Sequence, residues 1–388
     1  MPTQQTNRSD QRRSDRRTRR KRAPETVYAY LAGIVDADGT ITCPRVSATE
    51  SFPVAIAVHQ AEREAVDLFA TTFGGEVTMR DSYSPLATRE TYLWTASAGN
   101  RVEVLRRLLP HLRQKRRQAE IALEICRLNA SWRKPDRGLR RPKSITRKLR
   151  AEQTKMRRAN DFGKRAQNAR VPTPPKVLVA KVPRTVAAYL AGVLDADGHL
   201  RARRQIIYGY RRYPVEVKLK QVTPDSIQVL QRYFGIKVRV ESPSVEGGRH
   251  LLNWACAART AARLLATVEP YMLIKKERAK LLLECVRLNS IPRQPLTVPK
   301  VVPGEPLLPL AKAAKLAGVS YAGAAAAVRE GRAPGVRKAR GRRGESSVFV
   351  PASFIPEWRT RDHRKRPDEH YARLDALVAR CRKLNSRE

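Results

Sequence analysis

Cysteine is scarce in this sequence of 388 residues. The five that occur are Cys43, Cys126, Cys256, Cys285 and Cys381, and no two of them form a CxxC pair. An odd, scattered set argues against both a disulfide framework and a zinc site. The cysteine pattern therefore favours a reducing, cytoplasmic setting.

Long apolar runs are also missing. Charged residues interrupt every apolar stretch well short of a membrane span, so no membrane contact is expected. Residues 1–22 lack the apolar segment of a signal peptide and instead hold nine basic residues and two acids. We expect a disordered basic arm there, which either contacts a phosphate backbone or remains solvated.

Acidic residues are outnumbered by basic ones, 36 against 78, and the formal net charge is +42. A chain this basic repels itself unless a polyanion neutralises it, so nucleic acid is the expected partner. A ribosome-associated protein or an unspecifically adhesive basic protein is the alternative. Aromatic residues make up only 6%, but hydrophobic residues reach 41%, which is enough for a sizeable core.

The strongest signal is an internal repeat. The segment TVYAYLAGIVDADGTI begins at Thr26, and TVAAYLAGVLDADGHL begins at Thr185. Two further pairs match at nearly the same offset of 159 to 161 residues: 53–60 with 214–221, and 93–129 with 253–289. A register kept over such a length indicates a tandem duplication joined by a linker.

Each copy is predicted to read helix, two strands, helix, two strands, helix. The first helices should end at Gly39 and Gly198, which occupy the position that favours a left-handed C-cap. The last strands should end at Trp94 and Trp254, which we expect in the core. The predicted helices are 26–38, 61–72, 100–109 and 112–129 in the first copy, and 185–197, 223–233, 260–268 and 272–289 in the second.

The repeat divides the chain into a first half, 23–132, and a second half, 182–292. Between them, residues 133–181 form a basic linker with one predicted helix, 145–160. The C-terminal segment 365–388 carries a helix of similar Leu/Ala spacing that ends in Asn, as the linker helix does. We therefore predict that it completes the second half.

The inserted segment 304–360 differs in character. Two short apolar helices are separated by a Gly-Val-Ser turn, in which Ser320 is placed to cap the second helix. A basic hairpin follows. This pattern resembles the small winged helix-turn-helix of excisionase and MerR-like proteins, which implies DNA binding that includes Arg329 and Arg332. An Ala-rich hairpin used only for packing is the alternative.

Small residues recur at helical spacing in the repeated motif. Gly33 and Ala37 lie on one helix face, and Gly192 and Ala196 do the same. Small residues at this spacing let two helix backbones approach closely, so the two copies are expected to meet there. The contact would gather four carboxylates at the C-terminal ends of the helices, those of Asp36, Asp38, Asp195 and Asp197. Such crowding is costly unless divalent cations occupy the cleft, and carboxylates with water suit Mg²⁺.

Residues 31–39 and 190–198 closely match the signature of the LAGLIDADG homing endonucleases. The resemblance covers about 24–130 and 183–290. It implies an α+β fold in which two pseudo-symmetric αββαββα halves form a saddle over DNA. It also implies that Asp38 and Asp197 bind the metal, while Asp36 and Asp195 have structural roles.

The same resemblance assigns further catalytic positions in pairs. Gln60 and Gln221, at the end of the second strand of each half, match a polar residue that orders water near the scissile phosphate. Lys115 and Lys275, each five residues after a proline, match a lysine that stabilises the developing negative charge. The alternative for a single lysine in so basic a chain is a solvated charge.

The saddle strands would carry the residues that contact DNA. The candidates differ between the halves, which predicts an asymmetric target. They are Arg45, Arg80 and Arg89 in the first half, and Arg201, Arg203, Arg204, Tyr208, Tyr210, Lys218, Lys220 and Arg239 in the second.

The predicted function is a metal-dependent double-strand break at a long asymmetric DNA site, made by a monomer with internal pseudo-twofold symmetry. A nucleoid-associated location in a bacterium or phage-infected host fits this function. Two alternatives remain: a maturase that binds intron RNA and assists splicing, and a transcription regulator that binds DNA without cutting it. Both motifs retain their acids, Gln and Lys, which favours the nuclease.

Overall fold

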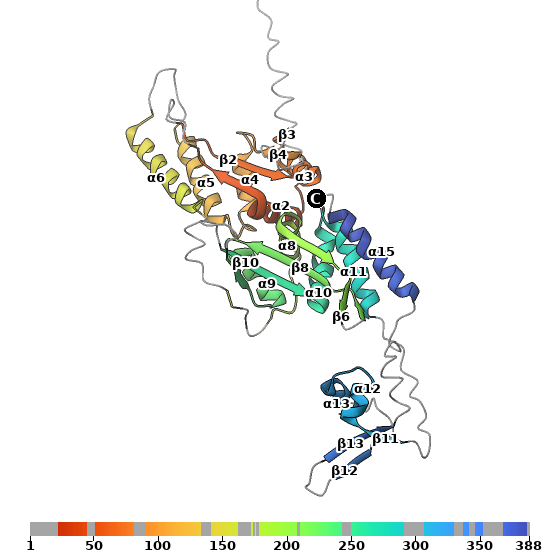
Figure 1. The fold of residues 1–388 in the computed structure, drawn as a ribbon. Helices are drawn as coiled ribbons and strands as arrows, with labels where there is room; N and C mark the ends of the chain where they lie inside the picture. Colours follow the sequence, from red (N-terminus) through yellow and green to blue (C-terminus); the bar gives the residue numbers. More distant parts are fainter. Residues whose placement is uncertain are drawn as a thin grey trace, which may run out of the picture. The chain divides into compact units, whose positions relative to one another are not determined.

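The computed structural model describes residues 22–44, 51–80, 90–132, 141–161, 172–173, 175, 178–207, 210–242, 250–290, 306–329, 337–340, 346–351 and 368–385. The chain divides into two compact units (Figure 1). The main unit takes in Met1–Val286 and Leu377–Glu388, and the small unit takes in Arg287–Ala376. Within the described residues, no helix is both long enough and apolar enough to span a bilayer.

The first half of the main unit contains one antiparallel sheet of four strands in the order β1-β2-β4-β3. Its elements follow the predicted order of helices and strands. They are α2 (Glu25–Asp38), β1 (Gly39–Thr42), β2 (Ala55–Gln60), α3 (Arg63–Phe73), β3 (Glu76–Arg80), β4 (Thr91–Thr95), α4 (Arg101–Leu108), α5 (Arg116–Ala130) and α6 (Lys143–Ala159).

The second half repeats this arrangement, with the strand order β5-β8-β10-β9. Its elements are α8 (Arg184–Asp197), β5 (Gly198–Ala202), β8 (Val215–Gln221), α9 (Asp225–Phe234), β9 (Arg239–Glu241), β10 (Leu251–Ala257), α10 (Ala258–Val268), a 3₁₀ turn (Glu269–Tyr271) and α11 (Lys276–Ser290). A separate hairpin, β6 (Gln205–Ile207) and β7 (Tyr210–Arg212), lies between β5 and β8. The predicted α+β class is therefore confirmed, with two four-stranded antiparallel sheets.

One face of each sheet is buried against helices because apolar residues alternate along its strands. In β2, Ile56 and Val58 are buried. Trp94, opposite Val58 on β4, is fully buried and stacks on Phe69 of α3 with ring centroids 4.7 Å apart. Its indole Nε1 donates a hydrogen bond to the carbonyl of Gly74 at 2.8 Å. Trp254 donates to Gly235 in the same way at 3.0 Å, so both tryptophans are core residues, as expected.

The glycines that follow the two motif helices do not adopt the predicted conformation. Gly39 has φ −84° and Gly198 has φ −74°, both extended, so the prediction of left-handed C-caps is wrong. The reason for glycine is steric. A Cβ on Gly39 would lie 2.7 Å from the Cα of Val35, and one on Gly198 would lie 2.4 Å from the carbonyl oxygen of Leu194. Glycine thus lets β1 and β5 begin directly where the helices end.

In each half, the end of a further helix contacts the long helix, α5 or α11, and the two contacts are equivalent. The amide of Gln118 on α5 donates to the carbonyl of Ala159, the last residue of α6, at 3.0 Å. Arg278 on α11 donates to the carbonyl of Leu384, near the end of α15 (Asp368–Asn385), at 2.9 Å. That α15 completes the second half remains a prediction, and these paired contacts favour it.

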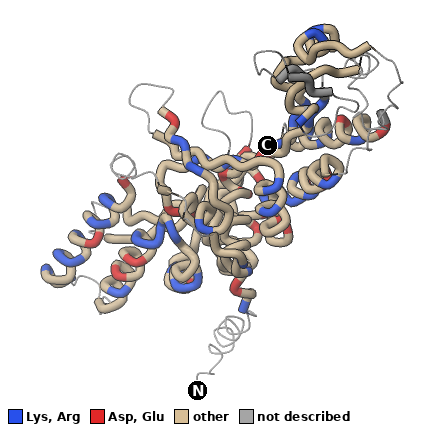
Figure 2. Tube along the Cα trace, turned by 90° about the horizontal axis from the view of Figure 1, so that it is seen from below, with Lys and Arg blue, Asp and Glu red and all other residues tan. Residues whose placement is uncertain are grey.

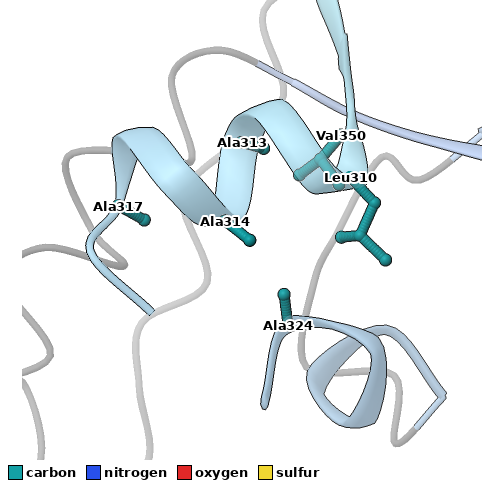
Figure 3. Close-up of a cluster of buried hydrophobic side chains, with 6 residues drawn as sticks. All are labelled: Leu310, Ala313, Ala314, Ala317, Ala324 and Val350. Carbon is teal, nitrogen blue, oxygen red and sulfur yellow. The ribbon is translucent and has the colours of Figure 1, made fainter. Parts of the chain in front are cut away.

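Among its described residues before Asp368, the small unit has a three-stranded antiparallel sheet, β11-β13-β12, and two short helices. Its elements are β11 (Leu307–Pro309), α12 (Leu310–Leu316), α13 (Tyr321–Arg329), β12 (Arg337–Arg340) and β13 (Ser346–Pro351). Small alanines on α12 and Ala324 on α13 pack with Leu310 and Val350 (Figure 3). The Ser320 hydroxyl accepts a hydrogen bond from the backbone N–H of Gly323 at 3.1 Å, so it caps the second helix as predicted.

Candidate active site between the two halves

The two motif helices, α2 and α8, pack against each other in the middle of the main unit (Figure 1). Two glycines allow this approach. A Cβ on Gly33 would lie 2.2 Å from the carbonyl oxygen of Tyr189, and a Cβ on Gly192 would lie 2.1 Å from that of Tyr30. Ala37 and Ala196, one turn further along, are only half-buried. The close contact of the backbones is therefore centred on the glycine pair.

Asp36, the first acid of the first motif, is fully buried and binds a loop. Its carboxylate accepts hydrogen bonds from the backbone N–H groups of Arg113, Gln114 and Lys115 at 2.7, 3.1 and 2.8 Å. Burial raises the pKa of Asp36, and the bond from the Arg113 N–H is the largest of the opposing effects. These bonds explain why α5 begins at Arg116, four residues later than predicted, because the preceding N–H groups point at the carboxylate.

Asp195 has the same role in the second half. It accepts from the backbone N–H groups of Leu273, Ile274 and Lys275 at 2.7, 3.1 and 2.9 Å. Burial likewise raises its pKa, opposed first by the bond from Leu273. The helix α11 begins at Lys276, just after this loop. Asp36 and Asp195 therefore fix each motif helix to the start of the long helix of its own half.

Two tyrosines that the sequence analysis did not single out connect the halves. The hydroxyl of Tyr189 on α8 donates to Asp36 Oδ2 at 2.9 Å, and the hydroxyl of Tyr30 on α2 donates to Asp195 Oδ2 at 2.9 Å. Each of these tyrosines is only 3% exposed. The two tyrosines occupy the same position in the repeated AYLAG segment, which was the available signal for their role. A tyrosine hydroxyl that is buried usually has a hydrogen-bond partner.

Asp38 and Asp197, the last acids of the motifs, remain open to solvent at least in part. Gln60, at the end of β2, donates from Nε2 to Asp38 Oδ2 at 2.6 Å. Gln221, at the end of β8, donates to Asp197 in the same way. Each Gln therefore orients the carboxylate of its own half.

The surroundings of the two carboxylates change their pKa values. Burial raises the pKa of Asp38 above its usual value. Burial and then the negative charge of Asp38 raise the pKa of Asp197 to about 6. This repulsion indicates that the last acids of the two motifs lie near each other. Lys115 and Lys275 partly offset it, since their charges lower both pKa values.

The two lysines are buried with their ammonium groups turned toward the ends of the motif helices. Lys115 Nζ donates to the carbonyls of Val35 and Asp36 at 2.8 and 2.6 Å. Lys275 Nζ donates to the carbonyls of Leu194 and Gly198 at 3.1 and 2.8 Å. These carbonyls lie at or just after the C-terminal ends of the motif helices, where those of Val35 and Leu194 also accept from the N–H groups of Gly39 and Gly198. In this geometry the lysines place positive charge at the helix ends that carry Asp38 and Asp197.

The donor set suits a hydrated hard cation. Within the described part of the chain, no three His, Cys, Asp or Glu side chains gather as a metal cluster. A pair of carboxylates fits Mg²⁺, which keeps several waters and takes only one or two protein carboxylates. Burial disfavours the charged forms of both Asp38 and Asp197, and the charge of Asp38 adds to this at Asp197. A cation held by these carboxylates would stabilise both charged forms.

The predicted DNA-contacting residues lie on different parts of the main unit. Lys218 and Lys220 lie on β8, Arg201 on β5, Arg239 on β9 and Arg80 on β3. Arg203 and Arg204 are exposed after β5, and Tyr210 begins β7. Arg329 is exposed at the end of α13 in the small unit. Arg45, Arg89, Tyr208 and Arg332 lie outside the described residues, as does nearly all of the predicted basic arm. Basic residues are spread over helices and strands of both units (Figure 2).

No protein-family model matches this sequence, and no curated protein matches it either. Among solved structures, the chain is similar to "I-SmaMI bound to uncleaved DNA target in the presence of Calcium ions", with 15% identity, a TM-score of 0.46, and coverage of 68% of this chain and 91% of that one. It is also similar to "LAGLIDADG homing endonuclease I-GzeII in complex with DNA target", with 10% identity, a TM-score of 0.46, and coverage of 68% and 90%. A third similar structure is "LAGLIDADG Meganuclease I-AabMI Bound to Uncleaved DNA", with 13% identity, a TM-score of 0.45, and coverage of 68% and 91%. Likeness at this level concerns the fold alone.

Proposed function

We propose that this chain is a DNA endonuclease of the homing type, which cuts both strands of one long asymmetric target with Mg²⁺. The observation that supports this most strongly is the meeting of Asp38 and Asp197. Each comes from the end of one of two symmetry-related helices, and the charge of Asp38 acts on Asp197. A duplex has two strands related by a pseudo-twofold axis, and a site with one carboxylate from each half has the same symmetry.

Within this proposal, Asp38 and Asp197 hold the cations, and Gln60 and Gln221 keep the carboxylates oriented. A bound divalent cation supplies an activated water and stabilises the leaving oxygen of a phosphodiester. Lys115 and Lys275 act as positioning residues, because each ammonium group is hydrogen-bonded to the helix end that carries the acid.

A net charge of +42 supports a polyanionic substrate. Neutralising phosphates with Lys and Arg releases counterions, which makes such binding strong and dependent on salt. The duplication places both catalytic acids in one chain, so a monomer can reach both strands.

The test is cleavage of a randomised duplex library by the purified full chain with Mg²⁺, followed by sequencing of the cut ends. Asp38→Asn and Asp197→Asn should each abolish double-strand cutting or leave only nicking, while DNA binding in EDTA stays nearly unchanged. Asp67→Asn is the matched control, because that carboxylate is 46% exposed on α3 and paired only with Arg63 in the contacts described. Double-strand cutting at the normal rate by either motif variant would refute the assignment.

A non-cleaving regulator and an RNA maturase are the competing functions. Binding of a defined duplex without any cutting by the wild-type chain would favour the regulator. Tighter binding of structured RNA than of any selected duplex would favour the maturase. The retention of Asp, Gln and Lys in both halves supports the nuclease.

We also propose that the small unit is a winged helix-turn-helix that adds DNA contacts. Its element order, β11, α12, α13, then the hairpin β12 and β13, matches such a module, and the turn between α12 and α13 is closed by the Ser320 cap. Deleting 304–360 should weaken affinity or shorten the footprint while the cut position stays the same. Loss of folding of the main unit after this deletion would instead support a packing role.

A further inference from the structure

The faces of the two sheets that are not buried in the core differ in chemistry at equivalent positions. Strand pairing identifies the equivalent residues. Val58 lies between Gly39 and Trp94, and Leu219 lies between Gly198 and Trp254. These residues mark the buried face of each sheet, so their neighbours along the strands define the open face.

The open face of the first sheet is composed mostly of small and methyl-bearing side chains. One row across the strands is Thr40, Ala57 and Thr95. The next row is His59, Leu93 and Thr78, of which Leu93 is buried at 5% exposure. At its margins the face carries one acid and one base, Glu76 and Arg80.

The open face of the second sheet carries charges at the equivalent positions. His199, Lys218 and Ala255 replace the first row, and Lys220, Asn253 and Arg239 replace the second. A further row pairs Arg201 with Glu216. Ala57 is thus replaced by Lys218 and Thr78 by Arg239. The two sheets share one strand arrangement but differ in the chemistry of this face.

The charged side chains of the second sheet are held in place by acids. Glu216 accepts from Arg201 Nε at 2.8 Å and pairs with Lys218 Nζ at 3.1 Å. Glu241 pairs with Lys220 Nζ at 2.6 Å. Arg201 and Lys218 are only 30% and 25% exposed. Side chains held in this way lose less rotamer freedom on binding. This favours specific recognition of a defined surface over non-specific binding to phosphates.

We propose that the first sheet binds an A·T-rich half-site through thymine methyl groups, and that the second sheet binds a G·C-rich half-site through guanine. This rests on the proposed DNA binding of the main unit. Ala and the methyl of Thr are suited to the thymine 5-methyl group in the major groove. Lys and Arg are suited to guanine O6 and N7, and Glu216 can accept from cytosine N4.

The first test is a binding selection with the wild-type full chain on a randomised duplex library in EDTA, so that no cleavage is needed. The selected site should be rich in A·T pairs on one side of its centre and in G·C pairs on the other. Lys218→Ala and Lys220→Ala should relax the preference for G·C on one side only. Lys155→Ala, which removes one exposed charge from α6, is the matched control and should leave both preferences unchanged.

The second test changes the DNA and leaves the protein intact. Uracil lacks the methyl group of thymine, so its substitution in the A·T-rich side should weaken binding about fourfold per contacted base, which corresponds to about 0.8 kcal/mol per buried methyl. Substituting 7-deazaguanine, which lacks N7, should weaken binding about tenfold per contacted guanine on the other side. As the control, uracil is placed in the G·C-rich half-site and 7-deazaguanine in the A·T-rich half-site, where neither should weaken binding to this extent.

Equal base composition on the two sides of the selected site would overturn this inference, as would analogue effects that do not separate by side. Failure of the proposed nuclease function would give a different experimental result. In that case the selected duplex would be bound with the expected composition but would stay uncut after Mg²⁺ is added.

Discussion

The substitution Asp197→Asn should have opposite effects on stability and on activity. The pKa of Asp197 is raised to about 6 by burial and by the charge of Asp38. The folded protein therefore binds this proton more tightly than the unfolded chain does. As a result, the charged carboxylate destabilises the fold at neutral pH, and removing the charge should stabilise it.

The magnitude follows from the shift in pKa. A rise from 3.8 to about 6 corresponds to at most about 3 kcal/mol of destabilisation. Solvent screening of an exposed side chain reduces this to on the order of 1 kcal/mol. The cost is absent below about pH 4, grows as the pH rises through the window up to about 6, and is constant above it. The stabilising effect of Asp197→Asn should follow the same course.

The assay is denaturant unfolding of the wild type and the variant in EDTA between pH 4 and pH 8. Adding Mg²⁺ should reverse the order at pH 7.5, because the cation stabilises only a fold that can bind it. Asp67→Asn, which removes an exposed carboxylate paired with Arg63, should not stabilise the protein at any pH. A variant that is less stable than the wild type at pH 7.5 in EDTA, by an amount that does not change with pH, would refute the reasoning.

Four further substitutions test the contact between the halves and the electrostatics of the acids. Gly33→Ala and Gly192→Ala should each destabilise the protein by about 2 kcal/mol or more in denaturant unfolding, because the added methyl meets a backbone carbonyl at 2.2 or 2.1 Å; unchanged stability would show that the helices do not touch there. Tyr189→Phe should cost about 1–3 kcal/mol, since it removes a hydrogen bond to a buried carboxylate, and a neutral result would contradict that bond. Lys115→Met should lower cleavage while shifting the apparent pKa of the activity upward in a pH–rate profile, because a positive charge near the acids is lost; an unchanged profile would leave this lysine without an electrostatic role.

Much of the architecture could be predicted because the chain contains two copies of one segment, which can be compared with each other. Two copies in register identify the helix ends, the buried faces of the strands and the paired positions of Trp94 and Trp254. Hydrophobic periodicity placed most helices within two residues of their observed bounds. The N-cap at Ser320 followed from local turn chemistry alone.

The errors have a common cause in contacts between segments far apart in the sequence. A glycine after a helix has two explanations, a left-handed cap or a close approach, and only the positions of Val35 and Leu194 show that the second applies. The later start of α5 results from three N–H groups that bind Asp36, 77 to 79 residues away. Sequence patterns give no information on contacts between residues so far apart in the chain.

The amino-acid sequence by itself determined the duplication, the small residues at the crossing, the four acids and the strongly positive charge, because these depend on residue type and spacing. Only the tertiary structure decided what surrounds each acid. It buries Asp36 and Asp195 under tyrosines from the opposite half and leaves Asp38 and Asp197 accessible beside a glutamine. The two kinds of acid lie only two residues apart in each motif, and their roles differ because burial and hydrogen-bond partners depend on how the helices pack.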